Sequence, residues 1–266
     1  MAASLKDKQK SLAGIIGREN RVAVACSGGV DSTLVLKISC DVLGCENVTA
    51  IFVDTPLMPP GEREAVGEIV ENIGCRLHVV RVDPLAWPDF AANPKERCYL
   101  CKKRIYRILL EELAESNIHV LLDGTNLDDL SDFRPGLKAL EELGVGTPLA
   151  EAGLTKKDVR RLSRDLNLPT WNKFSSSCLA TRIAPTQKIT PEKLDLVLQC
   201  EGFLQSLGYQ GCRVRISDDS AVIELLEDDI NTFINASVRL QVMKKINDSG
   251  IERVSVSMTG RQGIIL

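Results

Sequence analysis

The sequence lacks any long apolar run and any excess of positive charge. No stretch approaches the roughly 20 apolar residues that a membrane span needs, and the polar segment from Met1 to Lys10 has no apolar core of a secretion signal. We therefore expect a cytoplasmic protein with no membrane partner. The 33 lysines and arginines are balanced by 36 acidic residues, for a formal net charge of −3. This balance excludes a chain-wide basic surface for nucleic acid, and only a local patch could serve one.

Histidine, internal repeats and low-complexity segments are also scarce or missing. The two histidines, His78 and His119, lie far from the sequence Cys98-Tyr-Leu-Cys101, and there is no second Cys-x-x-Cys pair. A zinc site with four cysteines, or with two cysteines and two histidines, is therefore poorly supported. What is present is ample apolar content, 44% of 266 residues, which excludes wholesale disorder and permits one large domain or two modest ones.

The first part of the chain alternates apolar strands with helices. Strands are predicted at 21–26, 48–53, 77–82 and 119–123, and helices at 31–43, 61–73 and 94–116, the last with Asn93 as its N-cap. Strands separated by helices indicate an α/β fold with a parallel, doubly wound sheet. Thr155 begins a further helix, and residues 169–186 have no clean period and predict a long functional loop.

Beyond Thr190 the pattern changes to helix, two strands, helix and strand, over 191–207, 213–217, 221–226, 229–246 and 253–258. This order predicts a second, smaller α+β domain. We place the domains at 1–185 and 186–266, and expect the second to serve in substrate binding or oligomerisation.

A glycine-rich turn follows the first strand and leads into a helix. Its residues are Ser27, Gly28, Gly29, Val30, Asp31, Ser32 and Thr33. Adjacent glycines let backbone N–H groups approach an anion, the hydroxyls add donors, and the helix N-terminus adds partial positive charge. A carboxylate such as Asp31 repels phosphate unless Mg²⁺ lies between them. The alternative is a plain turn with a helix cap, but the full pattern resembles the PP-loop of the ATP-pyrophosphatase superfamily.

Asp54, at the end of the second strand, falls where such folds meet a nucleotide. Its alternative role is to cap a helix or turn.

Three of the nine cysteines are candidate ligands. Cys98 and Cys101 are three positions apart on a predicted helix, so their sulfurs share a face, and Cys178 lies in the patternless loop. We expect the lysines and arginines around the pair to favour thiolates. Three thiolates leave one iron of a [4Fe–4S] cluster open, which would suit sulfur transfer. The alternatives are unrelated buried thiols or a redox dithiol, and the six other cysteines are predicted to lie in the core.

Taken together, these residues resemble the LarE family of ATP-dependent sulfur transferases, which build the nickel-pincer nucleotide cofactor of lactate racemase. The resemblance covers nearly the whole chain. Outside the PP-loop it depends on the segments 122–124, 132–138, 170–173 and 213–215.

The family has two kinds: in one a single cysteine gives up its own sulfur, and in the other three cysteines hold a [4Fe–4S] cluster. Ungapped alignment from Trp171 to Arg182 places Ser177 at the position of the sacrificial cysteine, with Cys178 next to it. The chain therefore resembles the cluster kind.

The resemblance implies a substrate and cofactors. The substrate would be pyridinium-3,5-biscarboxylic acid mononucleotide, one carboxylate of which ATP adenylates with Mg²⁺, before sulfur from sulfide or a donor protein displaces AMP. Asp31, Ser177 and Cys178 would be catalytic, and Ser27, Gly28, Gly29, Ser32, Thr33, Asp54 and Arg182 would bind ATP. We also expect a homo-oligomer.

Residues of the second domain would bind the substrate. Arg213 and Arg215 alternate on a strand, so they face one side and could hold the substrate's phosphate. Glu201 and Glu224 match acidic family positions and could bind a cation, or be merely exposed carboxylates. Arg134 and Arg182 could contact phosphates or a neighbouring subunit.

Three other functions remain open at this point. A PP-loop tRNA thiolase also adenylates a carbonyl and can hold a three-cysteine cluster, but it should show salt-dependent tRNA binding. An ammonia-using ligase would leave the cysteines inert, and a nucleotide-binding module would not turn ATP over to AMP and pyrophosphate.

Overall fold

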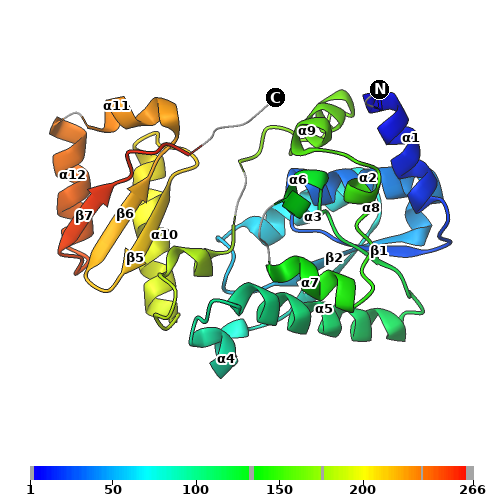
Figure 1. Ribbon diagram of the computed structural model, residues 1–266, viewed down its shortest axis with the longest axis horizontal. Helices are drawn as coiled ribbons and strands as arrows, with labels where there is room; N and C mark the ends of the chain where they lie inside the picture. Colours follow the sequence, from blue (N-terminus) through cyan, green and yellow to red (C-terminus); the bar gives the residue numbers. More distant parts are fainter. Residues whose placement is uncertain (1–2, 132–134, 175–176, 235, 262–266) are drawn as a thin grey trace.

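A computed structural model of the chain describes residues 3–131, 135–174, 177–234 and 236–261. These residues form two lobes, each with its own sheet (Figure 1). None of the described helices is long and apolar enough to cross a membrane.

The sheet of the larger lobe has four parallel strands in the order β3-β2-β1-β4. Its strands are β1 (Val22–Ala25), β2 (Val48–Asp54), β3 (Arg76–Arg81) and β4 (Leu121–Leu122). The chain moves outward from β1 through β2 to β3 and then returns to pair β4 with the other side of β1. The predicted α/β fold with a parallel sheet is confirmed.

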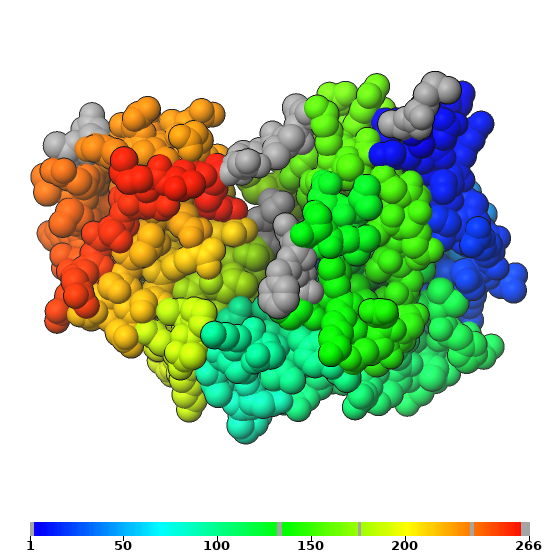
Figure 2. All heavy atoms as spheres, in the orientation of Figure 1, coloured from blue at the N-terminus to red at the C-terminus, as the bar shows by residue number. Residues whose placement is uncertain are grey.

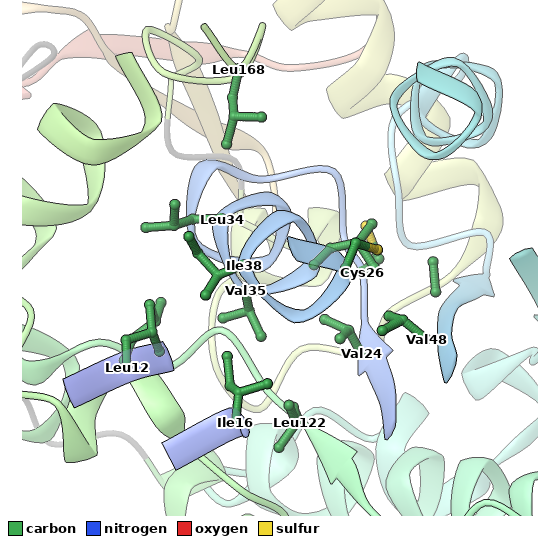
Figure 3. Packing of buried hydrophobic residues seen from close by; sticks show 14 of the residues in the cluster. Leu12, Ile16, Val24, Cys26, Leu34, Val35, Ile38, Val48, Leu122 and Leu168 are labelled. Carbon is green, nitrogen blue, oxygen red and sulfur yellow. The ribbon is translucent and has the colours of Figure 1, made fainter. Parts of the chain in front are cut away.

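Helices cover both faces of this sheet because alternate strand residues point to opposite sides. Val22 and Val24 pack with α1 (Leu5–Ile16), α2 (Val30–Leu43), α3 (Glu62–Ile73) and α9 (Lys156–Asp165). Ala23 packs on the other face with α5 (Arg97–Glu115) and α7 (Pro135–Glu142). Figure 3 shows α2 at the centre of the hydrophobic cluster that contains Val24, with Leu34, Val35 and Ile38 turned toward their neighbours. The helix that follows the glycine turn is therefore anchored along its length.

The smaller lobe has a three-stranded sheet in the order β5-β6-β7. β5 (Arg213–Ser217) pairs antiparallel with β6 (Ser220–Glu224), which pairs parallel with β7 (Arg253–Val256). α10 (Pro191–Ser206) precedes the sheet, as predicted. The helix predicted over 229–246 is instead two helices, α11 (Ile230–Phe233) and α12 (Ala236–Asn247).

The core of the smaller lobe extends into the loop before residue 186. Leu179, Ala180 and Ile183 belong to it, and so do Leu57 and Phe90 of the larger lobe. Figure 2 shows the lobes touching along one edge and hollowed between them elsewhere. The division at residue 185 stays a prediction, and the loop that carries Cys178 lies at the junction.

The predicted start of α5 is wrong. Asn93 is not its N-cap: Asn93 has a left-handed φ of 58°, and the helix begins at Arg97. The buried Asn93 amide donates to the backbone oxygens of Ala184 (2.8 Å) and Gln187 (2.9 Å). Asparagine tolerates this φ, and its amide finds partners across the lobe junction that a helix cap would forgo.

The shorter elements are η1 (Cys45–Asn47), η2 (Pro84–Ala86), α4 (Pro88–Ala91), α6 (Leu127–Ser131), α8 (Pro148–Glu151), η3 (Leu179–Arg182) and η4 (Glu227–Asp229).

Candidate active site

The glycine turn forms a preorganised loop at the N-terminus of α2. The Ser27 N–H donates to Ser32 Oγ (3.2 Å), and Ser32 Oγ donates to the Gly29 oxygen (3.3 Å). Gly28 has φ 71°, and a Cβ there would lie 2.7 Å from Val66 Cγ2. Gly29 is the N-cap of α2 and offers no side-chain cap. The end of a 14-residue helix is therefore available for an anion.

Asp31 is the carboxylate of this loop, and its partner is a cation of the protein. The Lys156 ammonium, at the start of α9, donates to Asp31, and the Asn126 amide donates to its other oxygen at 3.2 Å. Sequence reasoning did not assign Lys156 a role in the site. The one feature of the sequence that points to Lys156 is its position directly after Thr155, the N-cap of α9.

A cavity of about 290 Å³ opens beside this loop at the carboxyl ends of β1 and β4. The chain order reverses between these strands, which is where open α/β sheets bind ligands. Gly124 lets the chain after β4 approach the start of α2, because a Cβ there would lie 2.8 Å from the Ser32 nitrogen. The walls of the cavity include Cys26, Ser27, Asp31, Ser32, Lys102, Tyr106, Asp123 and Thr125.

Asp123, rather than Asp54, is the strand-end carboxylate on this cavity. Asp54 ends β2, one strand away from the reversal, and pairs with Arg63 (3.3 Å) and Arg81 (3.8 Å). Asp54 is absent from the residues that line the cavities at the PP-loop. The nucleotide contact predicted for Asp54 stays a prediction.

A larger cavity of about 730 Å³ joins the PP-loop to the junction of the lobes. It is bordered by Ser27, Gly29 and Asp31 at one end and by Ser177, Cys178 and Arg213 at the other. Lys173 and Glu62 form an ion pair of 2.7 Å on its wall. The structure thus brings together predicted site residues from both lobes.

A third cavity, of about 270 Å³, brings the three candidate cysteines together. Cys98, Cys101 and Cys178 line it beside apolar side chains such as Phe90 and Ile105. Cys98 and Cys178 are exposed and Cys101 is half-buried. Among the described residues, no three His, Cys, Asp or Glu side chains stand close enough together to hold a metal ion.

The basic neighbours of the Cys98 and Cys101 pair act as expected on Cys101, because Arg97 and Arg104 lower its pKa, but desolvation outweighs them. Desolvation by surrounding protein atoms raises the pKa of Cys101 to about 12 and also raises the pKa of Cys178. The nearby cations are engaged with carboxylates instead: Lys102 with Asp123, Lys103 with Glu142 and Arg104 with Asp89. Arg97 is the basic side chain that reaches a thiol, with its guanidinium 3.5 Å from Cys98 Sγ.

Arg182 holds the loop that carries Ser177 and Cys178. Its buried guanidinium pairs with buried Glu201 of α10 at 2.8 Å and donates to Ser177 Oγ (2.5 Å) and Thr181 Oγ1 (3.0 Å). Glu201 also accepts from the Val214 N–H at 2.9 Å. Glu201 is therefore not an exposed carboxylate, and its charge is already balanced. Arg182 does not line the cavities at the PP-loop.

Arg213 and Arg215 share a face of β5, as predicted, but only Arg213 lines the large cavity. Arg215 pairs with Glu224 and donates to the Thr181 oxygen at 2.8 Å. Burial, and then the neighbouring guanidiniums of Arg261 and Arg182, lower the pKa of Arg213 to about 10. Such a group of like charges suits an anionic ligand.

Most of the six remaining cysteines are core residues, as predicted. Cys26, Cys40, Cys200 and Cys212 are buried, and Cys45 and Cys75 are half-buried against the core. Cys26 lines the cavity of about 290 Å³ beside the PP-loop, which we call the nucleotide-side cavity. Burial raises the pKa of its thiol to about 11. Arg134 lies outside the described residues.

Sequence comparison shows which known proteins this chain is similar to. Residues 10–119 match the sequence model of the NAD synthase family. An uncharacterized protein of Synechocystis is 36% identical over 97% of this chain and 96% of its own length. The pyridinium-3,5-bisthiocarboxylic acid mononucleotide synthase of Lactiplantibacillus plantarum is 35% identical over 97% of this chain and 93% of its own. One component of the glutamine-hydrolyzing GMP synthase of Archaeoglobus fulgidus is 29% identical over 68% of this chain and 62% of its own.

Proposed function

The chain belongs to the pyridinium-3,5-bisthiocarboxylic acid mononucleotide synthase family, the LarE family, and we propose that it inserts sulfur into pyridinium-3,5-biscarboxylic acid mononucleotide at the expense of ATP. One observation carries this proposal: a single cavity is bordered by the PP-loop, by Cys178 and by Arg213. Activation, sulfur delivery and substrate phosphate binding can therefore meet in one place.

Adenylation would take place at the PP-loop. The uncapped start of α2 would bind the phosphates of ATP, with Lys156 and Lys173 as additional cations on the same cavity. Their present partners, Asp31 and Glu62, are the carboxylates that would face Mg²⁺ once phosphate oxygens take the ammonium groups. The substrate carboxylate would attack the α-phosphate and release pyrophosphate. A carboxylate oxygen is a poor leaving group, and adenylation would let it leave as part of AMP.

Arg213 would hold the substrate. A guanidinium is suited to bind a phosphate through two donors, and Arg213 lines the large cavity from β5 in the smaller lobe, whereas Asp31 lines it from α2 in the larger lobe. Arg215, bound to Glu224, would support it from the neighbouring position.

Cys98, Cys101 and Cys178 would hold a [4Fe–4S] cluster. Their donor chemistry fits, since three thiols and no competing histidine line one small cavity. When bound through three thiolates, the cluster supplies an iron without a protein ligand that can carry an extra sulfide. Because a thiol must lose its proton to become a cluster ligand, loading would release protons, and the raised pKa values of Cys101 and Cys178 oppose that loss until the iron is bound.

The test is turnover by protein prepared without oxygen. Given ATP, Mg²⁺, the biscarboxylate mononucleotide and sulfide, it should release pyrophosphate and yield a product in which sulfur replaces oxygen, read by mass spectrometry. Cys98→Ala, Cys101→Ala and Cys178→Ala should each lose most iron and sulfur insertion but keep pyrophosphate release. Cys45→Ala, outside this cavity, is the matched control and should keep both.

Three outcomes would contradict parts of the proposal. Absence of substrate-dependent pyrophosphate release by the wild type would remove the adenylation assignment. A full iron content in Cys178→Ala would remove the three-thiolate cluster, and dehydroalanine at any cysteine after turnover would indicate sacrifice of a protein sulfur.

A further inference from the structure

Lys102 lies on the wall between the nucleotide-side cavity and the cysteine cavity. Among the described residues that line these two cavities, Lys102 and Tyr106 are the two common to both. Lys102 directly follows Cys101 on α5, lines the same cavity as the three cysteines, and places its ammonium at Asp123, directly after β4. A cation at this position faces the nucleotide on one side and the sulfur source on the other.

A set of buried contacts fixes the Lys102 ammonium. Its Nζ lies 3.3 Å from Asp123 Oδ2 and 5.2 Å from the centre of the Tyr106 ring. The Tyr106 hydroxyl donates to the same carboxylate, and both the N–H (2.8 Å) and the hydroxyl of Thr125 donate to its other oxygen. Asp123 is 8% exposed. The carboxylate is therefore held by four donors from three residues, and it positions the ammonium.

Close packing of the Lys102 stem against α7 favours the same side-chain conformation. A Cβ at Gly136 of α7 would lie 3.1 Å from Lys102 Cδ. The stem is therefore enclosed between α7 and the strand end, and its ammonium is less free than that of a surface lysine.

We propose that Lys102 is a catalytic residue of the sulfur-insertion step, which stabilises the negative charge that develops when AMP leaves the acyl-adenylate. The inference rests on the proposed function. In this step the sulfur electron pair of a hydrosulfide-class anion forms the C–S bond, and the bond from the acyl carbon to the AMP oxygen breaks. AMP departs with that electron pair, the sulfur proton passes to water, and no oxidant or reductant is needed.

The location of Lys102 distinguishes it from the other cations of the site. Lys156 and Lys173 line the large cavity at the PP-loop and are absent from the cysteine cavity. In a cavity with apolar walls, a fixed ammonium stabilises developing charge more strongly than it would in water. Lys102 would therefore act after pyrophosphate has left, whereas the PP-loop acts before.

The experiment separates the two half-reactions in Lys102→Met, which keeps the apolar stem and removes the charge. Rapid quenching with ATP, the biscarboxylate mononucleotide and sulfide follows pyrophosphate, acyl-adenylate and thiocarboxylate together. We expect pyrophosphate release in the first turnover to stay within about threefold of wild type. Thiocarboxylate formation should fall by about 10²-fold, the cost of removing one such donor, and acyl-adenylate should accumulate. Lys102→Arg should recover part of the second step.

Lys103→Met is the matched control. Lys103 is the next residue on α5, but its ammonium binds Glu142 at 2.6 Å on the surface and lines neither cavity. It should resemble wild type in both half-reactions. Iron and sulfide content should be equal in all variants, which shows that the effect does not come from cluster loss.

Three outcomes would overturn the inference. If pyrophosphate release and thiocarboxylate formation fall together in Lys102→Met, the lysine serves adenylation. If neither changes, it is a spectator. If iron is lost, it serves the cysteine cavity alone. Failure of the wild type to release pyrophosphate is a separate result, which removes the proposed function and this inference with it.

Discussion

The two ends of the large cavity are held by different kinds of contact. At the PP-loop, the turn itself is held by hydrogen bonds between residues at most five positions apart, as between Ser27 and Ser32, and its Asp31 is bound by Lys156 and Asn126, which also belong to the larger lobe. At the Cys178 end, Arg182 pairs with Glu201 across 19 positions, and the Leu179 N–H donates to the Leu57 oxygen in the other lobe. The phosphate end is therefore held within one lobe, whereas the sulfur end depends on contacts between the two lobes.

This difference determines what a substitution should do at each end. A side chain at the PP-loop can be removed with little effect on stability, because α2 is anchored by its apolar face. A side chain that holds the Cys178 loop is part of the junction, so its loss should change stability and chemistry together. The predictions below test this contrast, beginning with the largest expected effect.

Asp31→Ala should abolish substrate-dependent pyrophosphate release and leave the thermal unfolding midpoint nearly unchanged. The carboxylate is one of the two that would face Mg²⁺, and its contacts to Lys156 and Asn126 lie at the cavity surface. Pyrophosphate assays and thermal unfolding measure the two effects.

Asp41→Ala is its control, since Asp41 is exposed on the same helix and binds only Lys37 at 2.5 Å among the described contacts. It should keep full pyrophosphate release. Wild-type release by Asp31→Ala would refute the PP-loop assignment.

Arg182→Ala should lower the free energy of unfolding by about 3–5 kcal/mol, because it leaves the buried Glu201 carboxylate without its cation. Denaturant unfolding measures this loss. The double variant Arg182→Met, Glu201→Leu should recover most of the stability, since an apolar pair of similar volume costs little.

The double variant should still fail in sulfur insertion, because Ser177 and Thr181 lose the donor that orders their loop. Recovery of sulfur insertion together with stability would show that Arg182 serves the fold alone.

The same contrast explains what the sequence could predict. The PP-loop was predictable because its chemistry is contained in seven consecutive residues, and the parallel sheet because its strands and helices alternate plainly. The roles of Glu201 and Arg182 were not, because an ion pair between η3 and α10 leaves no periodic signal.

Other errors have the same origin. Asn93 looked like a helix cap because caps are recognised locally, but its amide is used across the junction. The cations near Cys98 looked available because their carboxylate partners, such as Asp89 and Glu142, are distant in sequence.

Arg213→Ala should raise the KM for the mononucleotide more than Arg215→Ala does. A charge-assisted hydrogen bond is worth about 1.5–3 kcal/mol, or roughly one to two decades in affinity, and only Arg213 lines the cavity. Arg215→Ala should have the smaller effect, since Arg215 acts through Glu224 and the Thr181 oxygen. Steady-state kinetics measures both, and the KM for ATP should hardly change in either.

A substrate without its phosphate provides the control for this pair. It should be about equally poor for wild type and Arg213→Ala. If Arg213→Ala still prefers the phosphorylated substrate as strongly as wild type does, the phosphate site lies elsewhere.

The Cys101 and Cys178 thiols should titrate above the ordinary range in cluster-free protein. Desolvation favours the uncharged thiol, so the pKa of Cys101, raised from 9.0 to about 12, means less thiolate at any lower pH. The alkylation rate of Cys101 by iodoacetamide should therefore keep rising about tenfold per pH unit from about pH 7 to 10. In urea, where the chain is unfolded, the rate should level off near about pH 9. Peptide mass spectrometry measures each cysteine separately.

The shape of this profile separates desolvation from mere steric protection, and Arg97 sharpens the test. Steric protection lowers the rate by one factor at every pH and leaves the levelling point where it is in urea, whereas desolvation moves the levelling point upward. Arg97 lowers the pKa of Cys101 and Cys178, although desolvation by surrounding protein atoms has the larger effect on both. Arg97→Gln should therefore slow alkylation of Cys178 at about pH 8 by about threefold to fivefold, since a nearby charge contributes about 1 kcal/mol in water. Added salt should reduce this difference by screening the guanidinium. A rate for Cys178 that is unchanged in Arg97→Gln would mean that its neighbouring charge has no part in preparing the thiol.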